Sequence, residues 1–261
     1  MKSTQEKINL GSATARNGFC NEREIADKFN NWSGDTEARL WLQIMGYNLE
    51  EIELVKAVVI SGHKADINVQ ITIKLREAID VENLQVKLVS NNSGFNQVDK
   101  RWLSSYIDMW NIPPTVADTL KYFTGEIPPS KATRDSRRMF VNEFSIDEQK
   151  ELLSFLDENK VMIISDILRG RGEFCAEWVL VAQKVKSNAR WILKNINEVI
   201  NYYFGDGEVK ISPRGSINIG KVLMQRKGGD RGRPTANMLQ FKINPIELFE
   251  IGEQRGISTR K

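Results

Sequence analysis

Histidine and cysteine are scarce in this sequence, which has one histidine, His63, and two cysteines, Cys20 and Cys175, among 261 residues. A single histidine excludes a multi-histidine metal site and argues against a histidine-based nuclease or a Ser-His-Asp hydrolase. The cysteines have apolar neighbours and indicate reduced packing residues, so we expect neither a disulfide nor a zinc site. His63 precedes Asp66 by three residues, and a structural role is the more common one for such a loop histidine.

Long apolar segments are also absent. No run approaches the roughly 20 apolar residues that a membrane-spanning helix needs. The first ten residues lack the hydrophobic stretch of a signal peptide, and we therefore expect a cytoplasmic protein. The length allows a sizeable core, built as one large domain or as two closely joined lobes.

An excess of positive charge is small overall but unevenly distributed. The formal net charge is +3, yet residues 221–242 contain six basic residues and one acid. A second basic cluster, in residues 131–138, comprises Lys131, Arg134, Arg137 and Arg138. Such clusters, with glycines and aromatic residues nearby, suggest a polyanion as a partner. On charge alone, a pair of solvated loops explains them equally well.

Two predicted strands carry the clearest chemical pattern. Apolar and polar residues alternate in residues 67–75 and again in residues 84–88, as expected for half-buried strands. Paired as a hairpin, these strands would bring together Asp66, Gln85 and Lys87. The resulting patch would combine a carboxylate, an amide oxygen and an ammonium, which can hold Mg²⁺ and a phosphate group. The pattern alone is short, and a solvated polar face on an ordinary hairpin remains an alternative.

The residue types at this patch determine what else the site needs. Gln85 can ligate Mg²⁺ through its carbonyl oxygen but adds no negative charge, so we expect a third acidic group. The helical pattern of residues 21–29 offers Glu22 and Glu24, of which we favour Glu22. Lys87 would orient the attacking water or stabilise charge in the transition state. Similar patterns, with Asp206 as a weak candidate for the acid, occur at Gln225-Arg226-Lys227 and Gln240-Phe241-Lys242.

The rest of the chain reads as a mixture of helices and short strands. Helices are predicted at residues 24–29, 37–45 and 98–110, and a capping box at residues 145–148 predicts another. Residues 161–168 read as a strand or a short apolar segment, and residues 176–204 as two helical stretches. Four short strands follow, predicted at residues 209–211, 217–219, 222–225 and 238–241.

Several segments match a known family as strings. These include Gly94-Phe95-Asn96-Gln97, Asp166-Ile167-Leu168-Arg169-Gly170-Arg171-Gly172, Ala189-Arg190-Trp191-Ile192-Leu193, Pro213-Arg214-Gly215-Ser216-Ile217-Asn218 and Gln225-Arg226-Lys227-Gly228-Gly229-Asp230. They closely resemble the HinP-type type II restriction endonucleases, which are related to MspI within the PD-(D/E)XK nuclease superfamily. The resemblance extends from about residue 10 to residue 249.

The resemblance implies an α/β fold, with a mixed β-sheet core flanked by helices, and Mg²⁺-dependent cleavage of double-stranded DNA at GCGC after the first G. The family's Ser-Asp…Gln-X-Lys site corresponds to Ala65-Asp66…Gln85-Val86-Lys87, with alanine in place of the serine. Catalysis would fall to Asp66, Gln85, Lys87 and Glu22, and metal ligation to Asp66, Gln85, the Val86 carbonyl and Glu22. We expect Mn²⁺ to substitute for Mg²⁺, and Ca²⁺ to bind without supporting cleavage.

Further expectations depend on the same resemblance. One endonuclease domain spans residues 1–261, with a catalytic lobe at about 10–125 and a helical, DNA-recognition lobe at about 126–250. A cognate DNA methyltransferase would belong to the same restriction-modification system in a bacterial or archaeal cell. A palindromic target suits a homodimer, although one chain could also nick each strand in turn.

Candidate DNA contacts combine the basic clusters with polar loops. Arginine, lysine, asparagine and glutamine suit the guanine acceptors and cytosine donors of GCGC in the major groove, although each could equally contact a phosphate. The candidates are Phe95, Asn96, Gln97, Lys100, Arg214, Gln225, Arg226, Lys227, Arg231 and Arg233. Phe95 stands alone in a polar loop, and we favour a wedge at the flexible CpG step over a buried anchor.

Two other functions remain open at this level. A sequence-specific DNA-binding protein without cleavage would share the basic hairpin and Phe95 but need no metal. A repair or junction nuclease of the same superfamily would share the metal site. Both Asp66 and Lys87 are present, which argues against a protein without cleavage, and the whole-length resemblance disfavours a junction nuclease.

Overall fold

A computed structural model of the chain describes residues 4–73, 78–91, 94–185, 188–229 and 233–253. The chain forms two compact units, each assembled from separate stretches of sequence. Unit 1 contains residues 1–94, 169–199 and 244–261, and unit 2 contains residues 95–168 and 200–243. The lobe boundary that we expected near residue 125 does not coincide with these units, because the chain enters unit 2 and leaves it twice.

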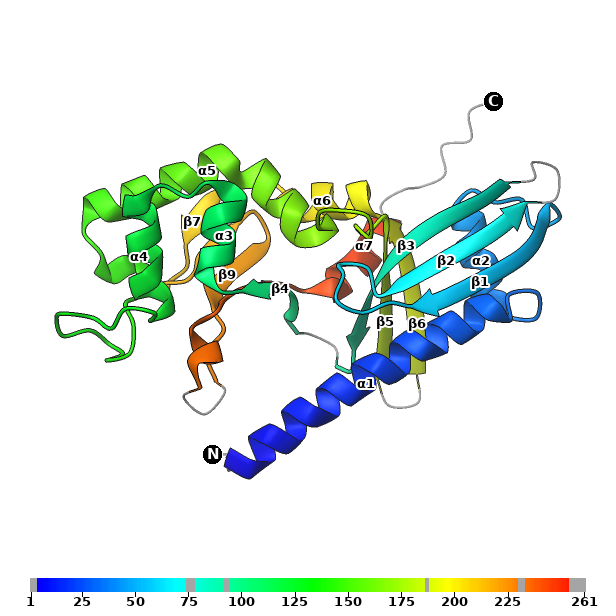
Figure 1. Ribbon diagram of the computed structural model, residues 1–261, viewed down its shortest axis with the longest axis horizontal. Coiled ribbons are helices and arrows are strands. Elements are labelled where there is room, and N and C mark those ends of the chain that lie inside the picture. Colours follow the sequence, from blue (N-terminus) through cyan, green and yellow to red (C-terminus); the bar gives the residue numbers. More distant parts are fainter. Residues whose placement is uncertain (1–3, 74–77, 92–93, 186–187, 230–232, 254–261) are drawn as a thin grey trace. The chain divides into compact units, whose positions relative to one another are not determined.

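Unit 1 is built on a mixed five-stranded sheet (Figure 1) with the order β1-β2-β3-β5-β6. The pairing of β3 with β5 is parallel, and the other three pairings are antiparallel. The strands are β1 (Ile52–Val59), β2 (Ile67–Ile73), β3 (Ala78–Val89), β5 (Trp178–Val185) and β6 (Asn188–Asn195). The mixed sheet that the family resemblance implied is therefore confirmed.

Two helices cover one face of this sheet, because alternate residues of the strands are apolar. In β2, Ile67, Val69 and Ile71 are fully buried. They pack in one core with residues of α1 (Thr4–Asn30) and α2 (Thr36–Ile44). Each fully buried aliphatic side chain of this kind contributes about 1.5–3 kcal/mol to stability.

Helix α1 is 27 residues long and begins well before Gly18. We had expected two short helices, at residues 24–29 and 37–45, and the second of these corresponds to α2. The first of these predictions was too short, since a glycine inside a helix costs only about 1 kcal/mol relative to alanine and does not end it. Near the end of α1, the Asn30 amide group donates to the Ala57 carbonyl at 3.2 Å and accepts from the Ala57 N–H at 2.8 Å. This pair of hydrogen bonds ties α1 to the edge strand β1.

Two segments of the sequence were assigned to the wrong structure. Residues 161–168 continue helix α5 (Ile146–Arg169) and form no strand. Residues 176–204 form β5, β6 and the helix α6 (Ile196–Phe204) where we expected two helices. Strand β5 is buried over five consecutive residues, because it lies inside the sheet with both faces covered. Its apolar run therefore has no period of two, and periodicity could not distinguish it from a buried helix.

Unit 2 contains an antiparallel sheet with the order β4-β10-β9-β8-β7. Its strands are β4 (Asn96–Arg101), β7 (Val209–Ile211), β8 (Ile217–Ile219), β9 (Val222–Arg226) and β10 (Leu239–Ile243). The four short strands predicted after residue 205 are thus confirmed within one or two residues. The helix predicted at residues 98–110 is wrong at its start, because residues 96–101 form β4 and the helix α3 (Leu103–Trp110) follows.

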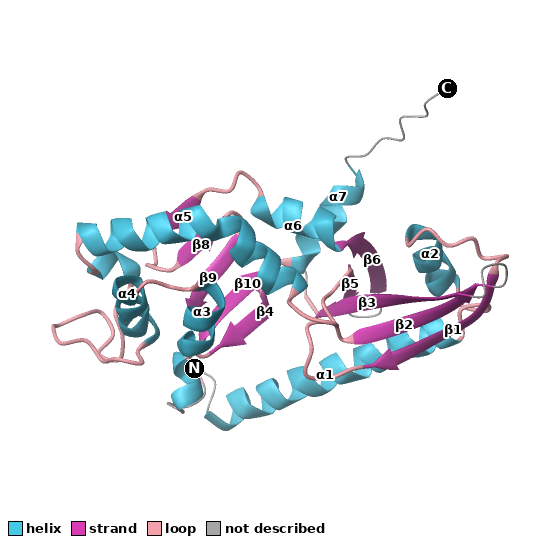
Figure 2. Ribbon diagram, turned by 45° about the horizontal axis from the view of Figure 1, so that its top comes forward, coloured by secondary structure: helices cyan, strands magenta, loops and turns pink. Residues whose placement is uncertain are grey.

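Helix α3 lies beside this sheet (Figure 2), and aromatic rings join the two. The Tyr106 and Trp110 rings stack at 4.7 Å, and both meet the Phe241 ring of β10 edge to face. The Tyr106 hydroxyl also donates to Asp99 of β4 at 2.6 Å. Phe241 therefore marks the core face of the second sheet, and its neighbours Gln240 and Lys242 lie on the opposite face.

The remaining elements are helical. Helix α4 (Pro114–Thr124) ends at Gly125, whose φ of 81° suits the left-handed end of a helix. The predicted capping box at the start of α5 is confirmed, since Ser145 and Glu148 bond each other's backbone N–H. Short helices complete the chain: η1 (Val141–Glu143), η3 (Pro234–Asn237), η4 (Pro245–Phe249) and α7 (Glu250–Glu253). No helix within the described ranges is long and apolar enough to cross a membrane.

Candidate functional site

Three predicted site residues lie together at one end of the β2–β3 pair in unit 1. Asp66 immediately precedes β2, and the register of Ile67 with Leu84 places it beside Gln85 of β3. Lys87 follows two residues later and therefore projects from the same face of the sheet as Gln85. The structure thus brings Asp66, Gln85 and Lys87 onto one patch.

Backbone hydrogen bonds fix Asp66 between its two neighbouring strands. Its N–H donates to the Leu84 carbonyl at 2.7 Å, and its carbonyl accepts from the Ile60 N–H at 2.9 Å. The side chain takes part as well, because Oδ2 accepts from the Val86 N–H at 2.6 Å. Within the described residues, Oδ1 has no hydrogen-bond partner, so this oxygen remains available to a ligand.

Gln85 is 3% exposed, and its amide group has a defined direction. Its Nε2 donates a long hydrogen bond of 3.4 Å to the Lys64 carbonyl, which leaves Oε1 as the outward acceptor. Gly170 lies against the side chain of Lys64. A Cβ atom at Gly170 would lie 2.5 Å from the Lys64 Cβ, and the φ of 83° at this position itself favours glycine.

Glu22 of α1 shares the electrostatic environment of this patch. The pKa of Glu22 is raised from 4.5 to about 7: burial of its carboxyl group has the largest effect, repulsion from Asp66 adds to it, and the Lys87 ammonium opposes it. The neighbouring acid behaves differently, since Glu24 forms an ion pair with Lys184 at 2.6 Å. Of the two acids that the sequence offered, Glu22 is therefore the one whose charge acts on Asp66 and Lys87.

The donor set fits a hard divalent cation. Asp66 and Glu22 supply carboxylates that interact electrostatically, and Gln85 adds an amide oxygen, so the oxygen types present are those that such a cation prefers. No group of three histidine, cysteine or acidic residues that could hold a metal ion occurs in the described part of the chain. The site therefore depends on Gln85 in the place of a third carboxylate.

Other groups that the sequence raised as candidates lie elsewhere or have structural contacts. The His63 ring is exposed and packs on the Phe174 ring at 4.5 Å. Cys20 and Cys175 are free thiols. Asp206, the weak candidate for the acid of the rival patterns, accepts a hydrogen bond from the Glu208 N–H at 3.0 Å.

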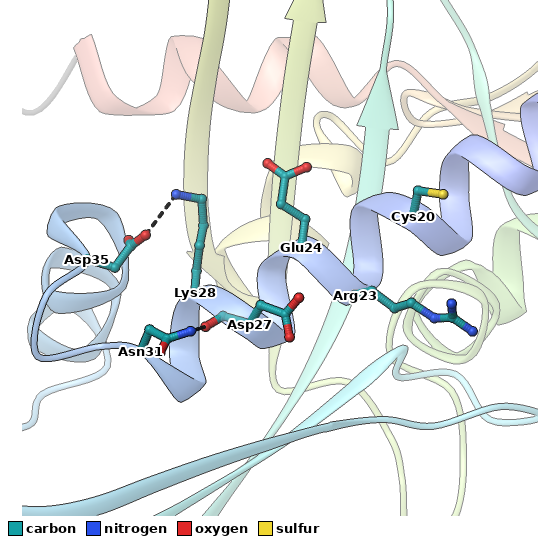
Figure 3. Close-up of a pocket in the computed structure, with 7 residues that line it drawn as sticks. All are labelled: Cys20, Arg23, Glu24, Asp27, Lys28, Asn31 and Asp35. Atoms are coloured by element: carbon teal, nitrogen blue, oxygen red, sulfur yellow. Dashed lines mark hydrogen bonds and ion pairs between the residues drawn. The ribbon is translucent and has the colours of Figure 1, made fainter.

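A hollow beside the second half of α1 has a lining that does not include Glu22, Asp66, Gln85 or Lys87; Figure 3 shows its side chains. It is lined by Cys20, Arg23, Glu24, Asp27, Lys28, Asn31 and Asp35. Its Lys28 ammonium is already bound to the Asp35 carboxylate at 2.9 Å. Glu24 of this hollow is bound to Lys184 at 2.6 Å, and we assign no chemistry to the hollow.

Unit 2 carries the predicted DNA contacts, several of them on one face of its sheet. We define the second-sheet polar face as the side that points away from the Phe241 core. Register places Gln225 opposite Gln240, Lys100 opposite Gln240, and Gln97 opposite Lys242. The polar face therefore comprises Gln97, Lys100, Gln225, Gln240 and Lys242.

Sequence reasoning did not select Gln240 or Lys242 as DNA contacts. The signal was present in the alternation of Leu239, Phe241 and Ile243 with these two polar residues. Burial lowers the pKa of the Lys242 ammonium, for which the described residues supply no ion-pair partner. An unpaired, half-buried ammonium on this face favours an anionic ligand.

Arginines from the two basic clusters converge on the other side of β9. Arg226 follows Gln225 along the strand and so projects from the opposite face, where it donates to Asn237 Oδ1 at 2.6 Å. Burial lowers the pKa of both Arg138 and Arg226, and repulsion adds to this effect: Arg226 acts on Arg138, and Arg137 acts on Arg226. Residues far apart in the sequence thus form one guanidinium cluster.

The other predicted contacts are spread over loops of unit 2. Phe95 is 55% exposed, directly before Asn96 at the start of β4. Arg214 is exposed in the turn between β7 and β8, and Arg233 is exposed before η3. The Lys227 N–H donates to the Met238 carbonyl at 2.8 Å, and Arg231 lies outside the described residues.

Comparison with known proteins relates both units to restriction enzymes. The family model of R.HinP1I restriction endonuclease matches residues 45–249, a range that includes Asp66, Gln85 and Lys87 but not Glu22. The fold is similar to the crystal structure of restriction endonuclease MspI in complex with its cognate DNA. The TM-score is 0.64 at 13% sequence identity, with 90% of this chain and 92% of that chain covered. No protein with a curated description matches significantly. The chain therefore belongs to the R.HinP1I restriction endonuclease family, and the protein is a type II site-specific nuclease.

Proposed function

We propose that this nuclease cleaves double-stranded DNA at GCGC, after the first G, with Mg²⁺ as its cofactor. The observation that supports the catalytic part is that Asp66, Gln85 and Lys87 share one patch at the end of the β2–β3 pair, with Glu22 of α1 electrostatically coupled to Asp66 and Lys87. The resemblance to HinP-type enzymes supplies the target sequence and the cut position. Restriction endonucleases of this kind generally use a divalent metal ion.

Four groups would hold the metal: a carboxylate oxygen of Asp66, Oε1 of Gln85, the backbone carbonyl of Val86 and the Glu22 carboxylate. When bound, a divalent cation polarises the phosphoryl oxygen and makes a water molecule more acidic. Asp66 can offer Oδ1 because Oδ2 is held by the Val86 N–H. Gln85 can offer Oε1 because its Nε2 faces the Lys64 carbonyl. We expect Mn²⁺ to replace Mg²⁺, and Ca²⁺ to bind without supporting cleavage.

Lys87 is the cation of the site. Its ammonium acts on Glu22, and among the described residues it has no ion-pair partner. It can therefore orient the attacking water or stabilise the extra negative charge that develops on the phosphate in the transition state. The side chain of Gln85, two residues earlier, is buried and therefore held in place by its surroundings. Together these residues would position water and phosphate with little rearrangement.

DNA recognition would fall to unit 2. The second-sheet polar face presents amide groups and ammonium groups, which suit base edges and phosphates in the major groove. The cluster of Arg137, Arg138 and Arg226 suits the phosphate backbone, which gives most of the salt-dependent affinity. Phe95, exposed at the start of β4, would enter the base stack at the central CpG step.

The biological setting follows from this activity. Such an enzyme would act in the cytoplasm, beside a cognate methyltransferase that protects host DNA. The palindromic target requires a cut in each strand, made either by the two catalytic centres of a homodimer or by one chain that nicks the strands in turn.

Digestion of unmethylated plasmid DNA with Mg²⁺ tests the proposal. Discrete fragments, whose number equals the number of GCGC sites, are expected with Mg²⁺ and not with EDTA. Specific binding without cleavage would favour a DNA-binding protein. Nicking at branched or damaged DNA, without sequence choice, would favour a junction or repair nuclease. A plasmid methylated within GCGC should resist cleavage if the target is correct.

A further inference from the structure

Three glutamine side chains form a chain of hydrogen bonds across the second-sheet polar face. Gln240 of β10 lies in the middle and is 6% exposed. Its Nε2 donates to Oε1 of Gln97 in β4 at 2.7 Å. Its Oε1 accepts from Nε2 of Gln225 in β9 at 3.5 Å. The two outer residues are less buried than Gln240, and Gln97 is exposed.

The central amide couples the directions of the other two. A carboxamide has one donor end and one acceptor end, so Gln240 can satisfy both neighbours only if they point the same way along the chain. Because Gln97 accepts through Oε1, its NH₂ group is left to face outward as a donor. Because Gln225 donates through Nε2, its Oε1 is left as an outward acceptor. Reversal of one amide would set two oxygens or two NH₂ groups against each other, so all three would have to reverse together.

This coupling has a bearing on base recognition. Purines differ in the major groove at position 6, where guanine presents an oxygen acceptor and adenine presents an amino donor, while both keep the N7 acceptor. An outward NH₂ group on Gln97 matches guanine, and an outward oxygen would match the adenine amino group. The direction of the Gln97 amide therefore selects between the two purines.

We propose that Gln240 is a specificity-determining positioning residue, which orients the Gln97 amide so that it donates to guanine. The inference rests on the proposed function, because it requires that the second-sheet polar face reads DNA. A simple structural role for Gln240 would need only some hydrogen-bond partner for its buried amide group. In such a structural role, the base chosen by Gln97 would not depend on Gln225, which lies at the other end of the row of three glutamines.

The dependence of the Gln97 amide on Gln225 can be tested by a substitution at residue 225. In a Gln225→Glu variant, residue 225 can only accept, so Gln240 must turn its NH₂ group toward it. The Gln240 oxygen then faces Gln97, which must also reverse and present its own oxygen outward. The variant should shift the preference from guanine toward adenine at the base that Gln97 contacts, although residue 97 itself is unchanged.

The experiment is a double-mutant cycle on sequence preference. Gln97→Met first identifies the base position at which discrimination is lost. The ratio of kcat/KM for duplexes with guanine or adenine at that position is then measured for four proteins: the wild type, Q225E, Q240M and Q225E/Q240M. Q225E should reduce the guanine preference by about tenfold, which is within the range of a base contact. It should cause no further change in the Q240M background, where the hydrogen bonds between the three glutamines are already lost. Thermal melting checks that each variant is folded, and Q240E replaces Q240M if the latter does not fold.

Each outcome decides the inference. An equal effect of Q225E with and without Gln240 would be a direct effect of the new charge and would overturn it, as would an unchanged guanine preference in Q225E. Loss of discrimination in Q240M, together with coupling to Q225E, would support it. If the wild type itself shows no sequence preference, the proposed function fails as well, whereas a selective wild type with uncoupled variants leaves the function intact.

Discussion

Val86 donates its backbone N–H to Oδ2 of Asp66 at 2.6 Å, so the strand that carries Gln85 and Lys87 is joined directly to the carboxylate beside them. Strand β2 begins at Ile67, and the Asp66 side chain takes the place of the backbone partner that Val86 would otherwise lack. A carboxylate that accepts a backbone N–H is held in one rotamer and one direction. The separation of Asp66 from the β3 residues is thus set by a hydrogen bond and does not depend on the metal.

Replacing Lys87 should separate binding from chemistry. We expect Lys87→Ala to lose at least 100-fold in the single-turnover cleavage rate, on the order of what one charge-stabilising group supplies, and to bind GCGC duplexes in Ca²⁺ almost normally. Lys56→Ala, which removes an exposed lysine of β1, is the matched control and should cleave as the wild type does. Asp66→Ala should remove all activity with Mg²⁺. A parallel loss of binding in Lys87→Ala would instead assign Lys87 to DNA contact.

Glu22 should destabilise the metal-free protein above neutral pH. Its pKa is raised from 4.5 to about 7, so the folded state favours the protonated form. The stability that protonation contributes is complete below pH 4.5 and is lost as pH rises through about 7. Glu22→Gln should therefore melt at a higher temperature than the wild type at pH 8, and at nearly the same temperature at pH 4.

The same substitution should also weaken the metal site. Mg²⁺ must compete with a proton at Glu22, so the concentration of Mg²⁺ needed for half-maximal cleavage should fall between pH 6 and pH 8 in the wild type. Glu22→Gln should need much more Mg²⁺ and lose this pH dependence. Glu24→Gln, which breaks the ion pair with Lys184, is the control and should retain both properties. Identical Mg²⁺ curves for wild type and Glu22→Gln would exclude Glu22 from the site.

Gly170 should be sensitive to a single added methyl group. In Gly170→Ala, the new Cβ would press on the side chain of Lys64, the residue whose backbone carbonyl accepts a hydrogen bond from Gln85. Alanine would also have to adopt the unfavourable positive φ of this position. Gly172→Ala provides the comparison, since Gly172 has a φ of 90° and no atom within 4 Å of its Cβ position. Both variants should lose about 1 kcal/mol or more of stability to backbone strain, but only Gly170→Ala should also lose cleavage rate. Equal cleavage rates would show that the Lys64 contact does not affect Gln85.

Phe95 should enter the base stack when GCGC is bound. A fluorescent base analogue at the central CpG step should brighten with the wild type and respond much less with Phe95→Ala, because the wedge unstacks that step. Phe19→Ala removes another exposed phenylalanine, 58% exposed in α1, and should leave the signal unchanged. Equal brightening with wild type and Phe95→Ala would exclude the wedge.

The sequence predicted those parts of the site that depend on local periodicity. Asp66, Gln85 and Lys87 could be placed because β2 and its neighbour alternate apolar and polar residues, and alternation fixes which side chains share a face. The same reasoning failed for β5, where burial on both faces removed the alternation. It also failed for residues 98–101, because Asp99 is polar in sequence but buried by its bond to Tyr106 in the structure.

The remaining parts depend on tertiary contacts that no local pattern encodes. Glu22 could be preferred to Glu24 only weakly from sequence, because the position of α1 depends on its packing against the sheet and on the hydrogen bonds between Asn30 and Ala57. The glutamine chain joins three strands, and Gln240 is separated from Gln97 by 143 residues. Such a contact becomes visible only when the order of strands in the second sheet is known.

The sequence of the ends produced by digestion is the most direct measure of the central claim. Plasmid DNA cut by the wild-type protein with Mg²⁺ should give fragments whose strands all begin with CGC at the 5′ end, with a two-base 5′ overhang. The corresponding G should remain on the neighbouring 3′ end, and Lys87→Ala should yield no such ends under the same conditions. Ends at a different fixed sequence, or ends without a common sequence, would contradict the account.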